Sequence, residues 1–234
     1  MKTVLVPTDF STYATAGVKI ASQIAERTGS PIVLLHNVYS LVNWDGISEE
    51  ERQKHSEIQS KTVEGDRKLD KLIGQDLDRE LTVRKMLTHG ITYNEIVSKA
   101  EQLSADLIIM DSHGNENPNR AFIGSNLQKV IRFATCPVLA TKSPFTKKKV
   151  QKIVFPSQFD FDVHKPFGEV LKLARALGAT IHLLFVNTPG QDKDISAIQQ
   201  QMKEFSNHYP DWKFKTIIRN QQDTVTGITE YCEE

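Results

Sequence analysis

Short apolar runs recur along the first 142 residues. Runs at 3–6, 31–36, 105–110 and 138–140 have the length and composition of strands that are buried on both faces. A loosely alternating run at 81–87 suits a strand nearer the edge of a sheet. The pattern therefore predicts five strands in this part of the chain.

Helical patterns lie between these strands. Apolar residues at helical spacing, or residues that favour helices, occupy 14–28, 48–73, 93–103 and 125–136. We interpret the polar stretch 48–73 as one surface helix. Strands joined by such helices form right-handed units with parallel strands. The sequence thus predicts an α/β fold with a five-stranded parallel sheet and helices on both faces.

The pattern starts again after residue 150. With an offset of 149 residues and no gap, the aligned pairs include Pro7 with Pro156, Phe10 with Phe159, Gly29 with Gly178 and Leu34 with Leu183. Strand, turn, helix and strand coincide in the two segments. Self-similarity of this kind indicates an internal duplication.

The duplication predicts the division of the chain. We expect a domain at 1–142, a linker at 143–150 and a partial second domain at 151–234. The second domain is expected to contain a helix near 196–205, a strand near 212–218 and a helix from 224 onward. Up to Glu234, the sequence offers no counterpart of the fourth strand, the loop after it or the fifth strand.

The loop after the fourth strand is the main candidate for chemistry. Residues 111–123 contain a glycine, a proline and three asparagines, and Gly124 and Ser125 open the next helix. A glycine-containing loop between a strand and a helix presents backbone N–H groups and the positive end of the helix. Phosphate oxygens bind at such places, so the loop predicts a phosphate site.

Composition narrows the functional classes. Lys and Arg together number 29, as do Asp and Glu, so no basic surplus indicates a nucleic-acid partner. The two cysteines have neither metal-ligand spacing nor a disulfide framework, and no two histidines have metal spacing. The N-terminus enters a strand directly, and no apolar run approaches the ~20 residues that span a bilayer. We therefore expect a cytoplasmic protein with no membrane partner.

Four segments resemble those of the universal stress protein family. They are VLVPTDFS near the start, VLLHNV in the second strand, ADLIIM in the fourth and CPVLATK in the fifth. The resemblance covers residues 1–142 as a complete domain and 150–234 as a partial one. It implies a flavodoxin-like, Rossmann-like sheet with strand order 3-2-1-4-5. Ligands of such sheets bind in the crevice where the strand order reverses.

One branch of this family binds ATP through the motif G-x-x-G, nine residues, then G-[S/T]. Gly114, nine residues and Gly124-Ser125 match its second half, whereas Asp111 occupies the first glycine position. A carboxylate there repels phosphate unless a metal ion or a basic side chain intervenes. Arg120, in the same loop, could reach a phosphate. The loop is therefore open to two interpretations, an adenine-nucleotide site and a degenerate loop.

The resemblance implies a set of residues for the nucleotide site. Asp9 would lie near the ribose and adenine, Asn37 would contact adenine through its backbone, and Ser125 and Asn126 would offer N–H groups to phosphates. The expected ligand is ATP with Mg²⁺, and no catalytic residue or resident metal is predicted. The complete set is Pro7, Thr8, Asp9, Asn37, Asp111, His113, Gly114, Gly124, Ser125 and Asn126.

Several other polar residues have simpler structural interpretations. We interpret Ser11 as a helix N-cap rather than a nucleophile, because no base lies at a recognisable position. His36 is expected to be packed or hydrogen-bonded, His89 to belong to a turn, and His113 to be a structural loop residue. Gln158 replaces the aspartate at the position of Asp9, so we expect no nucleotide site in the second domain.

These observations predict a stress-response binding and regulatory module, with slow ATP hydrolysis at most. One alternative is a family member that binds no nucleotide and acts through protein contacts. Another is an adenine-nucleotide enzyme such as an adenylyl transferase. Such an enzyme needs a glycine-rich loop after the first strand to bind pyrophosphate, and the loop here, VPTDFST, contains no glycine. A flavodoxin is disfavoured for the same reason. The resemblance also implies a homodimer, with the strand at 138–141 as a contact.

Overall fold

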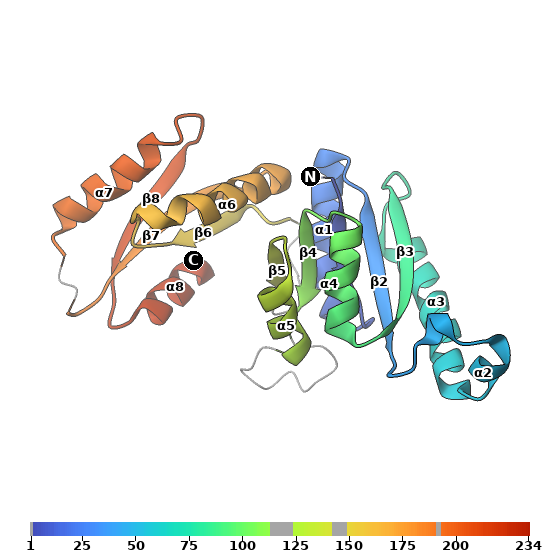
Figure 1. Ribbon diagram of the computed structural model, residues 1–234. Helices are drawn as coiled ribbons and strands as arrows, with labels where there is room; N and C mark the ends of the chain where they lie inside the picture. The colour runs from blue at the N-terminus through green and yellow to red at the C-terminus, as the bar shows by residue number, and fades with distance from the viewer. Residues whose placement is uncertain (1, 113–123, 142–148, 191–192) are drawn as a thin grey trace. The chain divides into compact units, whose positions relative to one another are not determined.

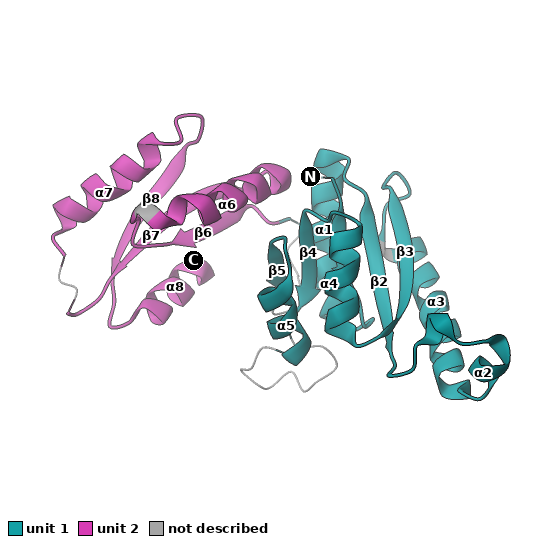
Figure 2. Ribbon diagram, viewed as in Figure 1, with its two compact units in different colours: residues 1–149 teal, residues 150–234 magenta. Residues whose placement is uncertain are grey.

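The computed structural model describes residues 2–112, 124–141, 149–190 and 193–234. The chain divides into two compact units, Met1–Lys149 and Val150–Glu234 (Figure 2). This division falls at the end of the predicted linker, most of which lies outside the described residues. None of the helices in the described ranges is long and apolar enough to cross a membrane.

The first unit is built on a five-stranded parallel sheet (Figure 1). Its strands are β1 (Val4–Pro7), β2 (Ile32–Tyr39), β3 (Val83–Gly90), β4 (Leu107–Asp111) and β5 (Val138–Thr141). Their order is β3-β2-β1-β4-β5, and each neighbouring pair is parallel. The predicted fold class, a flavodoxin-like α/β sheet with order 3-2-1-4-5, is therefore confirmed.

Helices cover both faces of this sheet. They are α1 (Ala14–Thr28), α3 (Ser56–Asp76), α4 (Thr92–Gln102) and α5 (Ser125–Phe133). α4 and α5 lie on one face, and α1 and α3 lie on the other (Figure 1). Because successive strand residues point to opposite faces, Val33 and Leu35 pack under α4, while Ile32 and Leu34 are buried beneath the other layer.

The prediction of a single helix over 48–73 is wrong. The segment forms a short helix, α2 (Glu49–Gln53), and then α3, with His55 between them at φ −111° and ψ 54°. Arg52 donates from Nε to the carbonyl oxygen of Trp44 over 3.2 Å, and its guanidinium lies over the Trp44 ring. These contacts hold α2 against the preceding 3-10 turn (Trp44–Gly46), so the helix does not continue straight into α3.

The interpretation of His89 as a turn residue is also wrong. His89 lies within β3, and its Nε2 atom is 2.8 Å from the hydroxyl oxygen of Thr62 on α3. Its ring lies 5.2 Å from that of Trp44, and burial lowers the pKa of the imidazole. His89 therefore joins the edge strand to the helix and to the Trp44 turn.

The second unit contains a three-stranded parallel sheet of order β6-β7-β8. Its elements are β6 (Lys152–Pro156), a 3-10 turn (Phe161–Val163), α6 (His164–Leu177), β7 (Thr180–Asn187), α7 (Ile195–Asn207), β8 (Phe214–Asn220) and α8 (Thr224–Glu233). Phe167 of α6 and Phe205 of α7 share one apolar core with β7. Tyr231 of α8 packs on the residues of the opposite face, including Leu184.

The first strand–helix connection has the same geometry in both units. Pro7 pairs with Leu35 in the first sheet, and Pro156 pairs with Leu184 in the second. Phe10 and Phe159 both adopt the left-handed region, at φ 65° and 55°. In each case the backbone N–H of the phenylalanine donates to the hydroxyl two residues earlier, over 3.0 and 2.9 Å. These correspondences recur at the offset of 149 residues that aligns the two sequences.

Candidate functional site

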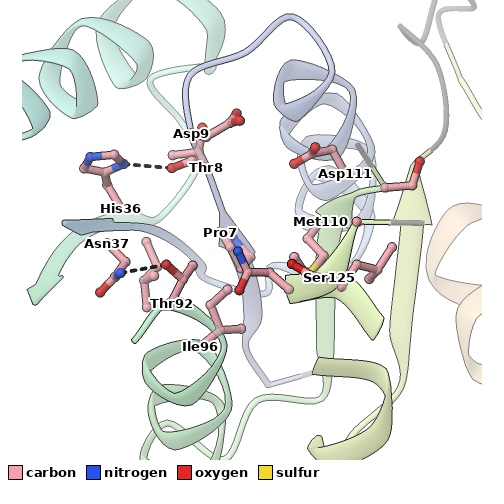
Figure 3. Close-up of a pocket in the computed structure, with 15 residues that line it drawn as sticks. Pro7, Thr8, Asp9, His36, Asn37, Thr92, Ile96, Met110, Asp111 and Ser125 are labelled. Carbon is pink, nitrogen blue, oxygen red and sulfur yellow. Dashed lines mark hydrogen bonds between the residues drawn. The ribbon is translucent and has the colours of Figure 1, made fainter. Parts of the chain in front are cut away.

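A pocket of about 290 Å³ lies at the carboxyl ends of β1, β2 and β4, beside the starts of α4 and α5 (Figure 3). The structure describes eight of the ten predicted site residues, and all eight line this pocket: Pro7, Thr8, Asp9, Asn37, Asp111, Gly124, Ser125 and Asn126. His113 and Gly114 lie outside the described residues, as does Arg120. The fold thus brings together residues that are more than 100 positions apart.

Asp9 is held by the turn that follows β1. Its Oδ1 atom accepts the backbone N–H of Ser11 over 2.9 Å, and the hydroxyl oxygen of Ser11 accepts the N–H of Ala14 over 3.1 Å. The Ser11 hydroxyl thus accepts the N–H of the first residue of α1, but the N-cap position is held by Tyr13, which makes no side-chain cap hydrogen bond, so the prediction of Ser11 as the N-cap is wrong. Among the described residues, the second carboxylate oxygen of Asp9, Oδ2, is buried without a hydrogen-bond partner. Buried polar atoms are normally paired, so this oxygen is a candidate acceptor for a ligand donor.

His36 supports the same turn from β2. Its Nδ1–H donates to the carbonyl oxygen of Thr8 over 2.9 Å (Figure 3). Its ring packs against Phe10 with centroids 4.5 Å apart. The prediction of a packed and hydrogen-bonded histidine is confirmed. Burial lowers the pKa of His36, and the nearby Lys68 lowers it further. The imidazole is therefore neutral at pH 7 and positions the Thr8 carbonyl.

The side chain of Asn37 is used within the protein. Its amide nitrogen donates to the Gly90 carbonyl over 3.1 Å and to the Thr92 hydroxyl over 3.0 Å, and its amide oxygen accepts from the Thr88 hydroxyl over 3.1 Å. These bonds join β2 to β3 and to the start of α4. A ligand at this place would consequently meet the backbone of Asn37, as expected from the sequence, rather than its amide.

The opposite side of the pocket is the start of α5. Asp111 ends β4 and is 7 % exposed, and the next residue, Ser112, donates its N–H to the Thr141 carbonyl over 2.8 Å. The Ser112 carbonyl in turn accepts the N–H of Gly124 over 2.7 Å. This bond ties the first turn of α5 to the end of β4. The first turn of α5 contains no acidic residue. Asp111 and the residues that open this helix, Gly124 to Asn126, line the same pocket.

The sequence did not predict the other residues that line the pocket. The apolar part consists of Leu35, Ile96, Met110 and Leu127, and Thr92 and Ser112 add hydroxyl groups. The apolar residues look like ordinary core positions in the sequence. Thr92 follows a strand that is far from the nucleotide motif, and only the pairing of β2 with β3 brings it to the pocket.

No group of three or more His, Cys, Asp or Glu side chains in the described ranges is arranged to hold a metal ion. The polar groups of the described lining are hydroxyls, backbone N–H groups, the His36 imidazole, the amides of Asn37 and Asn126, and two carboxylates. This set can bind a ligand that combines a flat apolar ring with hydroxyl and amino donors.

Comparison with known proteins identifies relatives of the first unit. The profile of the Universal stress protein family matches residues 1–142. Universal stress protein MJ0577 of Methanocaldococcus jannaschii is 29 % identical over an alignment of 153 residues, which covers 60 % of this chain and 94 % of the relative. Universal stress protein MJ0531 of the same organism is 30 % identical over an alignment of 151 residues, which covers 61 % of this chain and 83 % of that protein.

Solved structures extend the comparison. The structure of MJ0577 is 30 % identical, with a TM-score of 0.50, over 61 % of this chain and 96 % of its own. A universal stress protein from Archaeoglobus fulgidus DSM 4304 has a TM-score of 0.70 over 99 % of this chain and 83 % of its own, and at 16 % identity it shows the fold alone. The match of the family profile to more than half of the sequence shows that the chain belongs to the universal stress protein family.

Proposed function

We propose that the first unit binds an adenine nucleotide in the pocket between β1 and β4, and that the protein serves as a binding and regulatory module of the cytoplasmic stress response. The observation that carries this proposal is the Oδ2 atom of Asp9 inside the pocket, which is buried and has no hydrogen-bond partner among the residues that the structure describes. A buried carboxylate oxygen is stable only when it accepts a hydrogen bond, and the hydroxyl groups of a ribose and the amino group of adenine are hydrogen-bond donors.

The other lining residues fit the remaining parts of the same ligand. Ile96, Met110 and Leu127 offer an apolar surface to the base. Backbone N–H groups of Ser125 and Asn126, at the start of α5, suit phosphate oxygens. Mg²⁺ bound to ATP would reduce the phosphate charge beside Asp111. None of these groups is an evident general base, so we expect ATP hydrolysis to be slow at most.

Calorimetric titration of ATP with Mg²⁺ into the full chain and an Asp9→Asn variant tests this proposal. Asparagine keeps an oxygen for the N–H of Ser11 but replaces the second acceptor with a donor. We expect the variant to bind at least about tenfold more weakly, the equivalent of one lost hydrogen bond to a charged group.

Gln158→Asn is the matched control, because residue 158 occupies the position of Asp9 in the second unit. This variant should bind ATP like the starting protein. An Asp9→Asn variant with undiminished affinity would remove Asp9 from the site. Absence of binding by the starting protein would favour the alternative of a module that acts through protein contacts.

A homodimer through β5 belongs to the same proposal. β5 is the last strand of the five-stranded sheet, so one of its edges has no neighbour in that sheet. An open strand edge presents backbone N–H and carbonyl groups that can pair with a second copy. Light scattering at tens of micromolar, an order-of-magnitude choice for a transient interface, should give the mass of a dimer. A monomer mass at that concentration would contradict this part of the proposal.

A further inference from the structure

The ring of His36, on β2, is held between the turn after β1 and the helix α3. Its Nδ1–H donates to the Thr8 carbonyl over 2.9 Å, and its centroid lies 4.5 Å from that of the Phe10 ring (Figure 3). The backbone of α3 comes so close that a Cβ atom at Gly65 would lie 2.6 Å from Cδ2 of the imidazole. A ring packed this tightly has little freedom to move, so the position of its Nδ1–H is fixed.

The atom that accepts this hydrogen bond belongs to the peptide group that joins Thr8 to Asp9. Because a peptide group is planar, a hydrogen bond to its oxygen also fixes the direction in which the chain enters Asp9. Farther along the turn, Oδ1 of Asp9 accepts the N–H of Ser11 over 2.9 Å. The two hydrogen bonds together set the orientation of the carboxylate, whose Oδ2 atom is the acceptor in the proposed function.

The second unit forms the same turn without a histidine. At the offset of 149 residues, His36 corresponds to Phe185 and Asp9 to Gln158. Phe159 nevertheless keeps the left-handed backbone of this turn, at φ 55°. A phenylalanine side chain has no hydrogen-bond donor. The bond from His36 is therefore not needed to form the turn, and it occurs in the unit that also has the carboxylate.

From these observations we propose that His36 is a positioning residue of the nucleotide site, which orients Asp9 toward the ligand through the Thr8 carbonyl. This inference rests on the proposed function and adds the residue that sets its principal acceptor. The His36 ring also lines the pocket, so the experiment has to separate an effect through Asp9 from a direct contact with the ligand.

Calorimetric titration of ATP with Mg²⁺ into the full chain compares His36→Leu with His36→Asn. The two new side chains have nearly the same size and shape, and both lose the ring. Asparagine can place an amide N–H donor at about the position of Nδ1, whereas leucine has no donor. Each variant is also made in the Asp9→Asn background, which gives a double-mutant cycle.

His182→Leu is the matched control in the second unit. Nδ1 of His182 also makes a hydrogen bond, to the hydroxyl of Tyr231 over 2.7 Å, and its loss should leave the ATP affinity unchanged. His36→Leu should weaken ATP binding by roughly three- to tenfold, the range that corresponds to one neutral hydrogen bond. His36→Asn should recover most of this loss. In the Asp9→Asn background the leucine and asparagine replacements should bind ATP equally, because the carboxylate that they orient is absent.

Three results would overturn the inference, and they differ in what else they affect. If His36→Leu and His36→Asn bind ATP equally in the presence of Asp9, the hydrogen bond does not position the site, while the nucleotide site stands. If their difference persists in the Asp9→Asn background, His36 acts on the ligand directly rather than through Asp9. If the starting protein binds no ATP, the proposed function fails together with the inference.

Discussion

Gly65 and Gly74 lie on the same helix, α3, in different surroundings. A Cβ atom at Gly65 would lie 2.6 Å from Cδ2 of His36, whereas one at Gly74 would have no neighbour within 4 Å. The His36 ring is fixed by Thr8 and Phe10, so it has little room to move away. Glycine at position 65 therefore allows the helix to approach the residue that supports the pocket turn.

This contrast gives a matched pair of substitutions. Gly65→Ala should lower the free energy of unfolding by about 1–3 kcal/mol, as overpacked cores do. Gly74→Ala should raise it by up to about 1 kcal/mol, because alanine favours a helix. Urea denaturation followed by fluorescence measures both changes. Equal effects of the two substitutions on the free energy of unfolding would show that His36 does not restrict the size of the side chain at position 65.

Protonation of partly buried histidines should make stability depend on pH. Burial lowers the pKa of His36, His89 and His182 in the folded protein. In the unfolded chain a histidine titrates near 6.5, so below that pH the unfolded state binds more protons than the folded one. The free energy of unfolding must then decrease as the pH falls from about 6.5 toward the folded pKa values, and below those values this contribution stops changing.

His89→Gln offers a direct check of this pH dependence. Glutamine can still donate to the Thr62 hydroxyl but does not titrate. Urea denaturation between pH 7.5 and 5.5, both working values chosen around the histidine pKa, should show a smaller loss of stability for the variant than for the starting protein. Identical slopes would mean that His89 is protonated equally in both states.

At the scale of elements, α8 depends on one aromatic residue. Tyr231 is 4 % exposed, and its hydroxyl lies 2.7 Å from Nδ1 of His182 on β7. The cations of Lys152 and Arg219 lie 5.1 and 5.4 Å from its ring centroid. The ring thus connects α8 to all three strands of the second sheet through apolar packing, a hydrogen bond and two cation–π contacts.

Truncation of this residue should weaken the second unit. We expect Tyr231→Ala to cost about 3–5 kcal/mol, as for other buried aromatic residues, and Tyr231→Phe about 1 kcal/mol for the hydrogen bond. The chain has two tryptophans, Trp44 in the first unit and Trp212 in the second. In a Trp44→Phe background, fluorescence during urea denaturation therefore reports the second unit. A Tyr231→Ala transition at the original urea concentration would contradict this role.

At the scale of the whole molecule, charge balance should govern solubility. The 29 basic and 29 acidic residues give a formal net charge of zero at pH 7 and an isoelectric point near 7.1. Molecules without net charge repel each other least. Solubility in polyethylene glycol should consequently be lowest near pH 7 and rise on either side.

Replacement of exposed Val63 by lysine adds a positive charge on α3, at a side chain that is 66 % exposed. This variant should move the solubility minimum to higher pH with little effect on folding. A minimum that stays near pH 7 would indicate that specific contacts, rather than net charge, control association.

The sequence predicted the elements of the sheet and eight of the residues that line the candidate pocket, because both depend on local patterns. Apolar runs of strand length and helical stripes identify elements without reference to their partners. The turn after β1 and the start of α5 have distinctive local chemistry, in Asp9 and in Gly124-Ser125. The break at His55 was missed, because it depends on the contact of Arg52 with Trp44 rather than on any helix-breaking residue.

By itself, the sequence determined the strand order through the family resemblance, the repeat at an offset of 149 residues, and the set of residues expected at a nucleotide site. Tertiary structure alone decided how those residues are used. In the part of the chain that the structure describes, the Oδ2 atom of Asp9 is buried without a hydrogen-bond partner. The amide of Asn37 is hydrogen-bonded within the protein, and Thr92 lines the pocket. The physical reason is that hydrogen-bond satisfaction and burial depend on neighbours from other strands and helices, which a one-dimensional pattern does not contain.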